Sequence, residues 1–153
     1  MTPGKGQARN LRHLGIVVRD MEKSLAFYRD LLGMEVTSRR EETGAYLDTL
    51  LGVKHGKIQT VKLSAGGGAT LLELIEFESP EPGADPERQV NTPGPTHIAV
   101  TVADVKRLSA ALKRNGIRFV SEPLTSPGRR ARLAFCRDPE GNLVELVEER
   151  PNP

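Results

Sequence analysis

The hydrophobic and polar positions of the chain follow one pattern twice. The segments 12–24 (RHLGIVVRDMEKS) and 96–108 (THIAVTVADVKRL) each contain a histidine, a run of alternating apolar residues and then an aspartate. Alternation of this kind is typical of a half-buried strand. Beyond the aspartate, apolar residues recur at helical spacing in both copies: Met21, Leu25, Tyr28 and Leu32, then Val105, Leu108 and Leu112. Each copy therefore predicts a strand followed by an amphipathic helix.

The ends of both helices are predicted from aspartate and glycine positions. Asp20 and Asp104 stand where a short carboxylate can accept hydrogen bonds from the free backbone N–H groups of a helix start. Gly33 and Gly116 follow the last apolar residue of each helix, where a left-handed backbone often ends a helix. We therefore expect each helix to begin directly after its aspartate and to end at its glycine.

The repeat resumes in the later part of each half. ATLLELIEF (69–77) and GNLVELVEE (141–149) align residue by residue, and turn-forming segments precede both. Further strands are predicted upstream of these two, at 35–40, 57–63, 117–120 and 131–136. Each half then has the order β-α-β-β-β, which places the chain in the α+β class.

The repeat also divides the chain into segments. We expect a flexible N-terminal tail at 1–10, a first module at 11–77, a linker rich in proline and glycine at 78–94, and a second module at 95–149. The segment 46–57 (YLDTLLGVKHGK) has helical character and no match in the second half. It forms either the wall of a pocket or a packing element.

Composition narrows the function classes. With 153 residues, 37% of them hydrophobic, the chain is long enough for one domain with a real core. A net charge of +2 and 4% aromatic residues do not favour nucleic-acid binding, and no apolar run reaches membrane-spanning length. The N-terminus lacks the apolar core of a signal peptide, and the single cysteine excludes an intramolecular disulfide. We therefore expect a cytoplasmic protein that binds neither nucleic acid nor membrane.

Strand alternation places two glutamates of the repeat among apolar neighbours. Glu73 and Glu145 each stand between apolar residues two positions away on either side: Leu71 and Ile75, and Leu143 and Val147. An unpaired carboxylate in such a place is costly unless a cation or strong hydrogen bonds compensate for lost hydration. His13 and His97 also occupy matching positions, so the four side chains together predict one metal site. Imidazole and carboxylate donors suit a divalent Ni, Co, Zn, Mn or Fe ion. The alternative is that a duplication left these residues behind without a metal.

Two other reactive side chains are better explained by structure. His55 lies in GVKHGK, which has no counterpart in the second half, and we expect it on a surface loop. Cys136 follows RLAF in a strand pattern and has no identifiable histidine partner for nucleophilic chemistry. We expect Cys136 to be a buried packing residue.

The quoted segments together resemble one known family. HLGIVVRDMEKSLAFYRDLLGMEV, LLELIEF, THIAVTVADV and FCRDPEGNLVELVEE are similar to the paired modules of the vicinal oxygen chelate superfamily, over about residues 11–149. That superfamily includes glyoxalase I, methylmalonyl-CoA epimerase, extradiol dioxygenases and bleomycin resistance proteins. The resemblance implies two βαβββ modules whose mixed sheets curve into a cup with the helices outside. It also implies metal ligands at His13, Glu73, His97 and Glu145, a set similar to that of glyoxalase I.

For function, the resemblance implies a metal-dependent lyase of the glyoxalase I type or an isomerase of the methylmalonyl-CoA epimerase type. Both reactions stabilise an enolate-type intermediate of a small oxygenated substrate while a carboxylate moves a proton at the adjacent carbon. Candidates for this carboxylate are the ligands Glu73 and Glu145 and the non-ligands Glu41 and Glu42. The alternative functions are an extradiol-type dioxygenase and a metal-free binding protein similar to bleomycin resistance proteins.

Substrate charge and assembly are the last expectations. Several arginines lie on or beside predicted strands: Arg39, Arg40, Arg129, Arg130 and Arg132. Arginines lining the cup would favour an anionic substrate, whereas scattered solubilising charge is the alternative. The resemblance favours a homodimer. The linker is long enough for the modules to pair within one chain or to exchange between two chains.

Overall fold

The computed structural model describes residues 10–83 and 91–150. The predicted tail at 1–10 therefore falls almost entirely outside the described residues, and so does the middle of the predicted linker at 78–94. None of the helices in the described ranges is long and apolar enough to cross a membrane.

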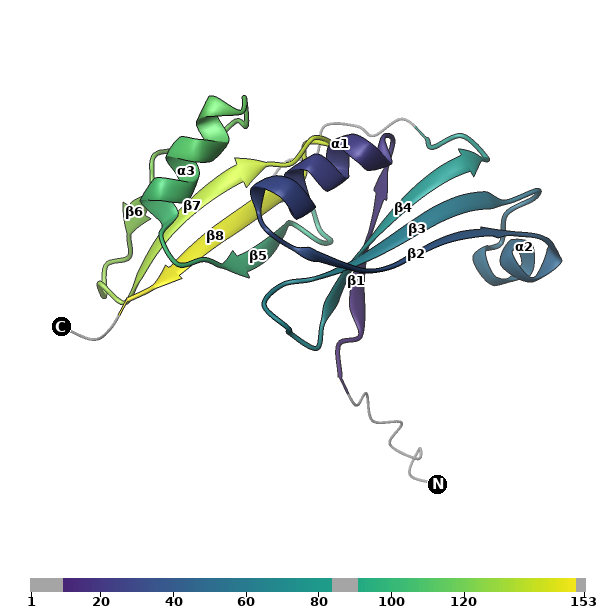
Figure 1. Ribbon diagram of the computed structural model, residues 1–153, viewed down its shortest axis with the longest axis horizontal. Helices are drawn as coiled ribbons and strands as arrows, with labels where there is room; N and C mark the ends of the chain where they lie inside the picture. Colours follow the sequence, from purple (N-terminus) through teal and green to yellow (C-terminus); the bar gives the residue numbers. More distant parts are fainter. Residues whose placement is uncertain (1–9, 84–90, 151–153) are drawn as a thin grey trace, which may run out of the picture. The chain divides into compact units, whose positions relative to one another are not determined.

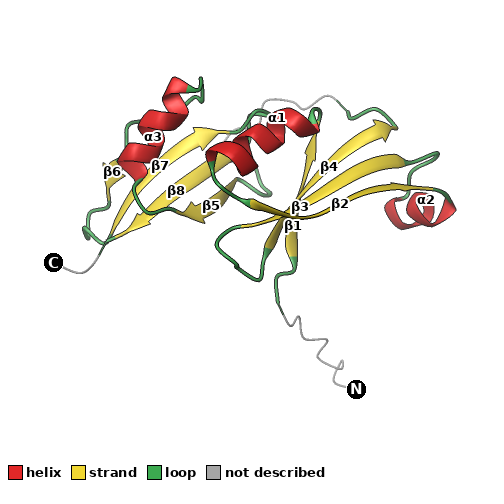
Figure 2. Cartoon of the chain, in the orientation of Figure 1, coloured by secondary structure: helices red, strands yellow, loops and turns green. Residues whose placement is uncertain are grey.

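The first half of the chain has the predicted order of elements, with one added helix (Figures 1 and 2). Helix α1 continues directly into a π-helical segment, η1, and the added helix is α2. The elements are β1 (His13–Val18), α1 (Met21–Leu25), η1 (Ala26–Leu31), β2 (Glu35–Thr43), α2 (Ala45–Leu51), β3 (Lys57–Ser64) and β4 (Leu71–Ser79). The helical character of 46–57 is confirmed in its first part by α2.

The second half repeats this order without the added helix. Its elements are β5 (His97–Thr101), α3 (Val105–Arg114), β6 (Leu124–Thr125), β7 (Ala131–Arg137) and β8 (Leu143–Glu149). One predicted strand is wrong: 117–120 forms only an isolated bridge from Phe119 to Cys136, and the short strand lies at β6 instead. Pro123 and Pro127 flank β6, and because proline has no N–H to donate, the ladder cannot extend past them.

In the described part of the chain, the strands form two four-stranded sheets of the same topology. Their orders are β1-β4-β3-β2 and β5-β8-β7-β6, with the first pair parallel and the other pairs antiparallel in each sheet. Two mixed sheets with few helices confirm the predicted α+β class. The sequence repeat is thus a repeat of sheet topology.

The chain divides into two compact units that do not coincide with the sequence repeat. Among the described residues, one unit contains 10–21 and 32–82, and the other contains 22–31, 83 and 91–150. Most of the first repeat's helix therefore belongs to the same unit as the second sheet. Figure 1 shows α3 over β7 and β8 in that unit, which agrees with the contacts of α3 with both strands.

A hydrogen bond between two buried side chains joins residues 22–31 to the second sheet. Tyr28 is fully buried, and its hydroxyl donates to Asp138 Oδ2 at 2.7 Å. Burial, together with the Asp138 carboxylate, raises the pKa of Tyr28 far above its ordinary value. Asp138 also accepts hydrogen bonds from the backbone N–H groups of Glu140 and Asn142 and from Asn142 Nδ2, so it organises the turn between β7 and β8.

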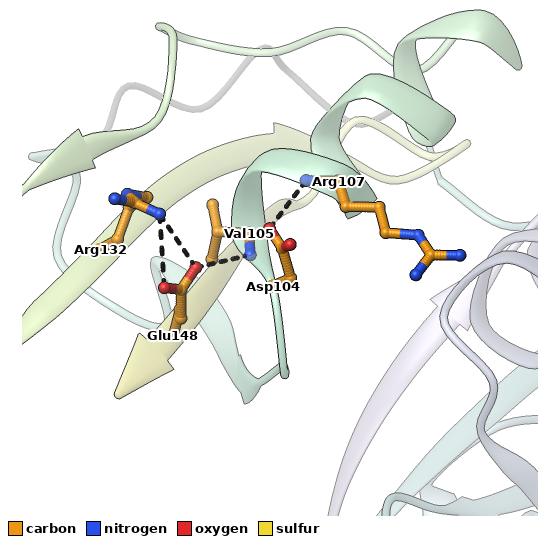
Figure 3. A network of polar contacts seen from close by, with 5 residues as sticks. All are labelled: Asp104, Val105, Arg107, Arg132 and Glu148. Carbon is orange, nitrogen blue, oxygen red and sulfur yellow. Dashed lines mark hydrogen bonds and ion pairs between the residues drawn. The ribbon is translucent and has the colours of Figure 1, made fainter. Parts of the chain in front are cut away.

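The first backbone N–H of each repeat helix donates a hydrogen bond to a glutamate on the last strand of its module. Glu76 Oε2 accepts a hydrogen bond from the backbone N–H of Met21 at 3.1 Å, and Glu148 Oε2 accepts one from Val105 at 2.9 Å. Figure 3 shows Glu148 between this N–H and the guanidinium of Arg132. A carboxylate at a helix start satisfies a free N–H and complements the helix dipole. The matching glutamates of the repeat therefore fix how each helix starts.

Asp104 acts as the predicted N-cap of α3. Its backbone is extended, and its Oδ1 accepts a hydrogen bond from the backbone N–H of Arg107 at 2.9 Å (Figure 3). At the other end, Asn115 is the C-cap and Gly116 follows with φ of 79°, the left-handed backbone predicted there. The equivalent N-cap role of Asp20 stays a prediction.

Each sheet buries the face opposite its candidate ligands. In the first sheet Val18, Val61 and Leu74 are fully buried, and strand register places them on the face away from Glu73. In the second sheet Val144 and Leu146 are likewise buried on the face away from Glu145. The apolar positions that the sequence assigns to one side of each strand therefore form the core, and the histidines and glutamates lie on the other side.

Candidate metal centre

The first candidate pair consists of His13 on β1 and Glu73 on the neighbouring strand β4. His13 Nε2 lies 3.1 Å from Glu73 Oε2. Gly15 lies directly opposite Glu73 in the parallel register. Lys62 lies opposite Glu73 on the other side, on β3, with its Nζ 3.4 Å from Glu73 Oε1. Glu73 is thus held at one oxygen by an imidazole and at the other by an ammonium group.

The second candidate pair consists of His97 on β5 and Glu145 on β8. His97 Nε2 lies 3.3 Å from Glu145 Oε2, and Ala99 takes the place that Gly15 has in the first sheet. Phe135 lies opposite Glu145 on β7, with its ring edge-on to the His97 imidazole at a centroid distance of 5.2 Å. In the described part of the chain Glu145 has no lysine or arginine partner.

The two histidines differ in what their second ring nitrogen contacts. His97 Nδ1 lies 2.7 Å from Thr96 Oγ1, which is hydrogen-bonding distance. His13 Nδ1 is buried and has no hydrogen-bond partner among residues 10–83 and 91–150. A partner at Nδ1 fixes the orientation of an imidazole and leaves Nε2 as the free donor atom. Only the second histidine has that support in the described residues.

Both pairs have the chemistry and spacing of neighbouring metal ligands. Nitrogen and carboxylate donors that bind one transition-metal ion at about 2.1 Å and at angles of 90–110° lie about 3.0–3.4 Å apart. The separations of 3.1 Å and 3.3 Å fall in that range. Both carboxylates are largely buried, with 14% and 18% of the side chain exposed, so each gains from a cation. The two pairs therefore fit two half-sites for a divalent ion.

The two half-sites lie in different units. His13 and Glu73 belong to the first unit, and His97 and Glu145 belong to the second. Across the described ranges, no three His, Cys, Asp or Glu side chains gather at one point with the spacing of a metal site. The structure brings each predicted pair together, and the convergence of all four side chains on one ion stays a prediction.

The two non-ligand carboxylates predicted near β2 lie on opposite faces of the first sheet. Glu42 pairs in register with Ile58, which shares the face of Lys62 and Glu73, and Thr60 Oγ1 lies 3.5 Å from Glu42 Oε1. Glu41 alternates to the other face and is exposed. Glu42, but not Glu41, therefore shares a face with the first half-site.

The arginines considered for substrate binding also divide between faces. Arg132 pairs in register with Glu148 and forms an ion pair with it on the helix-covered face of the second sheet (Figure 3). Arg39 pairs in register with Val61, on the face away from Glu73, and donates to Gln59. Arg40 is exposed and shares the face of Lys62. Strand register thus leaves Arg40 on the face of the first half-site.

The structural interpretations of His55 and Cys136 agree with their positions. His55 is exposed on the loop after α2, with a φ of 55°. Cys136 is fully buried in β7, and burial, followed by the nearby Asp138 carboxylate, raises the pKa of its thiol to about 11. A neutral buried thiol is a poor nucleophile.

Sequence reasoning missed Lys62 and Thr96, which contact the two half-sites. Lys62 follows from the pairing of β3 with β4, and no local pattern shows which residue stands opposite Glu73. Thr96 directly precedes His97, whereas Arg12 precedes His13, so the difference was visible in the aligned segments. Thr96 could have been identified by comparing the two repeats position by position, including the positions at which they differ.

Comparison with known proteins gives a consistent result. Residues 10–146 match the model of the Glyoxalase/Bleomycin resistance protein/Dioxygenase superfamily. The chain is 33% identical to the uncharacterized protein YwkD of Bacillus subtilis, over 92% of this chain and 98% of that one. It is 30% identical to a probable lactoylglutathione lyase of Vibrio cholerae, over 90% of this chain and 89% of that one. A glyoxalase family protein of Bacillus cereus shares the fold, with a TM-score of 0.89 at 23% identity over 97% and 99% of the two chains.

Proposed function

Because the chain belongs to the Glyoxalase/Bleomycin resistance protein/Dioxygenase superfamily, we propose that it is a metal-dependent enzyme that moves a proton at the carbon next to a substrate carbonyl. The observation that supports this most is the repeated pair of imidazole and carboxylate at ligand spacing, once in each sheet. Similarity to a probable lactoylglutathione lyase favours a lyase of that type over an epimerase-type isomerase.

The proposed ligands are His13, Glu73, His97 and Glu145, which would hold one divalent Ni, Co, Zn, Mn or Fe ion. Such an ion, when bound, supplies Lewis-acid chemistry that polarises the oxygen of a carbonyl substrate. The protein would contribute orientation: Thr96 Oγ1 lies at hydrogen-bonding distance from His97 Nδ1, and in the tautomer that carries its proton on Nδ1 the Nε2 lone pair would be available to the ion. Whether the four ligands come from one chain or from the two chains of a homodimer is left open by this proposal.

Among the four candidate carboxylates, Glu145 is the best base. Its Oε2 faces His97, the residue opposite it on β7 is the uncharged Phe135, and no lysine or arginine among the described residues neutralises it. Both oxygens of Glu73 have partners, because Lys62 contacts Oε1 and His13 contacts Oε2. Glu145 would therefore take the substrate proton and return it to the neighbouring carbon.

The test is elemental analysis of protein purified without chelator, together with turnover of candidate substrates. We expect about one divalent ion per site in the parent, and strong loss in His13→Ala and Glu145→Ala, because each removes one of the four donors. His55→Ala is the matched control, since it removes an exposed histidine of the first unit that lies outside both pairs. The substrate screen contains hemithioacetals of 2-oxoaldehydes and acyl-CoA thioesters. Equal metal content in the parent and all three variants would refute the proposal.

One observation favours a second function, a metal-free binding protein. Lys62 already neutralises Glu73, as a sheet without a bound cation requires. In that case the parent contains no stoichiometric metal and shows no turnover, but a small molecule still stabilises it against heat. Metal content therefore separates the two functions, and oxygen uptake with a catechol separates either from a dioxygenase.

A further inference from the structure

The two half-sites are related by the repeat, yet the residue opposite the glutamate differs between them. Lys62 stands opposite Glu73, and Phe135 stands opposite Glu145. We infer that Lys62 is the built-in counter-ion of Glu73, so that the divalent ion is held mainly by His97 and Glu145 and more weakly by the first half-site. The inference rests on the proposed function only in assuming that the protein binds a divalent ion.

The position of Lys62 makes its ion pair a fixed feature of the sheet. Strand β3 lies between β2 and β4, and its ladder places Lys62 directly beside Glu73. The side chains are 29% and 14% exposed, so water and salt screen this pair less than a surface pair. The ammonium group is therefore already beside Glu73 before any ion binds.

The second half-site lacks the competing charge and has additional support. Phe135 packs edge-on against His97 and brings no charge to the pair. Thr96 holds His97 Nδ1, whereas His13 Nδ1 has no partner among the described residues. Preorganised ligands lose less freedom when they bind a metal. Two independent differences thus point to the second half-site as the stronger one.

The direction of the effect follows from Coulomb's law. An ammonium group and a divalent cation that share one carboxylate repel each other, and Lys62 can relieve the repulsion only by leaving Glu73. At a separation of about 5 Å in a water-like dielectric, one positive charge lowers the affinity for a dication on the order of tenfold. Removing the charge should therefore tighten ion binding.

The experiment measures the affinity of the metal-free full-length protein for Co²⁺ by competition with a chromophoric chelator. We expect Lys62→Met to bind Co²⁺ on the order of tenfold more tightly than the parent, because Met is an unbranched side chain only one atom shorter and carries no charge. Lys62→Arg keeps the charge and is the matched control, with an affinity near that of the parent. Phe135→Lys introduces the ammonium group into the second half-site and should weaken binding.

A second measurement assigns the effect to one half-site. In the parent, Glu145→Gln should reduce Co²⁺ affinity more than Glu73→Gln does. With Lys62→Met in the background, the two losses should become similar, because both glutamates then face the ion without competition. A role of Lys62 in folding alone would shift thermal unfolding but would leave the ratio of the two losses unchanged.

The outcomes separate failure of this inference from failure of the proposed function. Tighter binding by Lys62→Met supports the inference. If the parent binds no Co²⁺ but Lys62→Met does, the inference is still supported, whereas metal-dependent function of the parent is refuted. Equal affinity in the parent and Lys62→Met overturns the inference and leaves the proposed function standing. Absence of Co²⁺ binding in both proteins overturns both.

Discussion

Replacing Tyr28 with phenylalanine tests what holds residues 22–31 in the second unit. The change removes one hydroxyl group and no ring atoms, so packing of the buried ring is retained. It also removes the hydrogen bond to Asp138, whose side chain is buried with only 4% of the residue exposed. We therefore expect the free energy of unfolding to fall although the shape of the core is unchanged.

The expected magnitude follows from the partners of Asp138. A hydrogen bond to a charged group contributes about 1.5–3 kcal/mol, and a buried acceptor that loses a donor gains nothing in return. Three donors remain on Asp138 after the substitution: the N–H groups of Glu140 and Asn142 and the amide of Asn142. They keep the carboxylate hydrogen-bonded, so we expect a loss near 1.5 kcal/mol, which corresponds to a decrease in Tm of about 3–6 °C.

The assay is urea unfolding followed by far-UV circular dichroism, with thermal unfolding as a second readout. Tyr46→Phe is the matched control, because Tyr46 is 76% exposed and the chain contains two tyrosines and no tryptophan. The control should stay within about 0.5 kcal/mol of the parent. In the Tyr46→Phe protein, tyrosinate absorbance should appear only as the fold opens at high pH, because burial and Asp138 raise the pKa of Tyr28.

Equal stability of the two Tyr→Phe variants would refute this reasoning. It would mean that water replaces the lost donor, or that residues 22–31 are held by apolar packing alone. A double-mutant cycle with Asp138→Asn separates these cases, because a direct bond produces a coupling energy between the two positions. If the effects of the two substitutions are additive, the hydrogen bond between Tyr28 and Asp138 does not contribute to stability.

Three further predictions concern other polar contacts. Glu148→Gln should lower the free energy of unfolding in the urea assay by about 1–3 kcal/mol, because it breaks a part-buried ion pair and weakens the start of α3. The control Glu149→Gln, at an exposed position, should change it by less than about 0.5 kcal/mol. Burial raises the pKa of the Cys136 thiol from 9.0 to about 11. The stabilisation from the buried neutral thiol is therefore present below pH 9 and is lost as the pH rises to about 11. Between these pH values the free energy of unfolding should fall less in Cys136→Ala than in the parent. Asp48→Ala removes the acceptor for two backbone N–H groups of the loop after α2, at 3.0 Å and 2.6 Å, and limited proteolysis should then cleave that loop faster.

The repeat made most of the fold predictable. Matching strand and helix patterns in 12–24 and 96–108 imply the same topology twice, and both sheets have it. Alternation alone assigned Leu14, Ile16 and Val18 to one side and His13 to the other, because side-chain direction in a strand depends on local geometry. Asp104 and Gly116 were predictable for the same reason, since helix caps depend on residues within one turn.

Features that depend on pairing between distant segments were not predictable. The ion pair of Lys62 with Glu73 requires the β3–β4 register, which no local pattern contains. The grouping of residues 22–31 with the second sheet depends on packing between segments far apart in sequence. The strand expected at 117–120 is only a bridge, and the short strand lies instead at β6, where prolines at 123 and 127 limit the ladder to two residues. The sequence predicted one site of four side chains; the structure shows His13 beside Glu73 and His97 beside Glu145, and the shared site stays a prediction.

The second unit is made of two separate stretches of the sequence, and this has a consequence for protein synthesis. Residues 22–31 leave the ribosome before any strand of the second sheet has been made, because that sheet begins at His97. At about 5–20 residues per second, they wait on the order of ten seconds for Asp138 to emerge. During this delay Phe27 and Tyr28, both buried in the finished protein, lie open to chaperones and to neighbouring nascent chains. The order in which the ribosome delivers the two halves therefore decides how long these two aromatic side chains stay exposed.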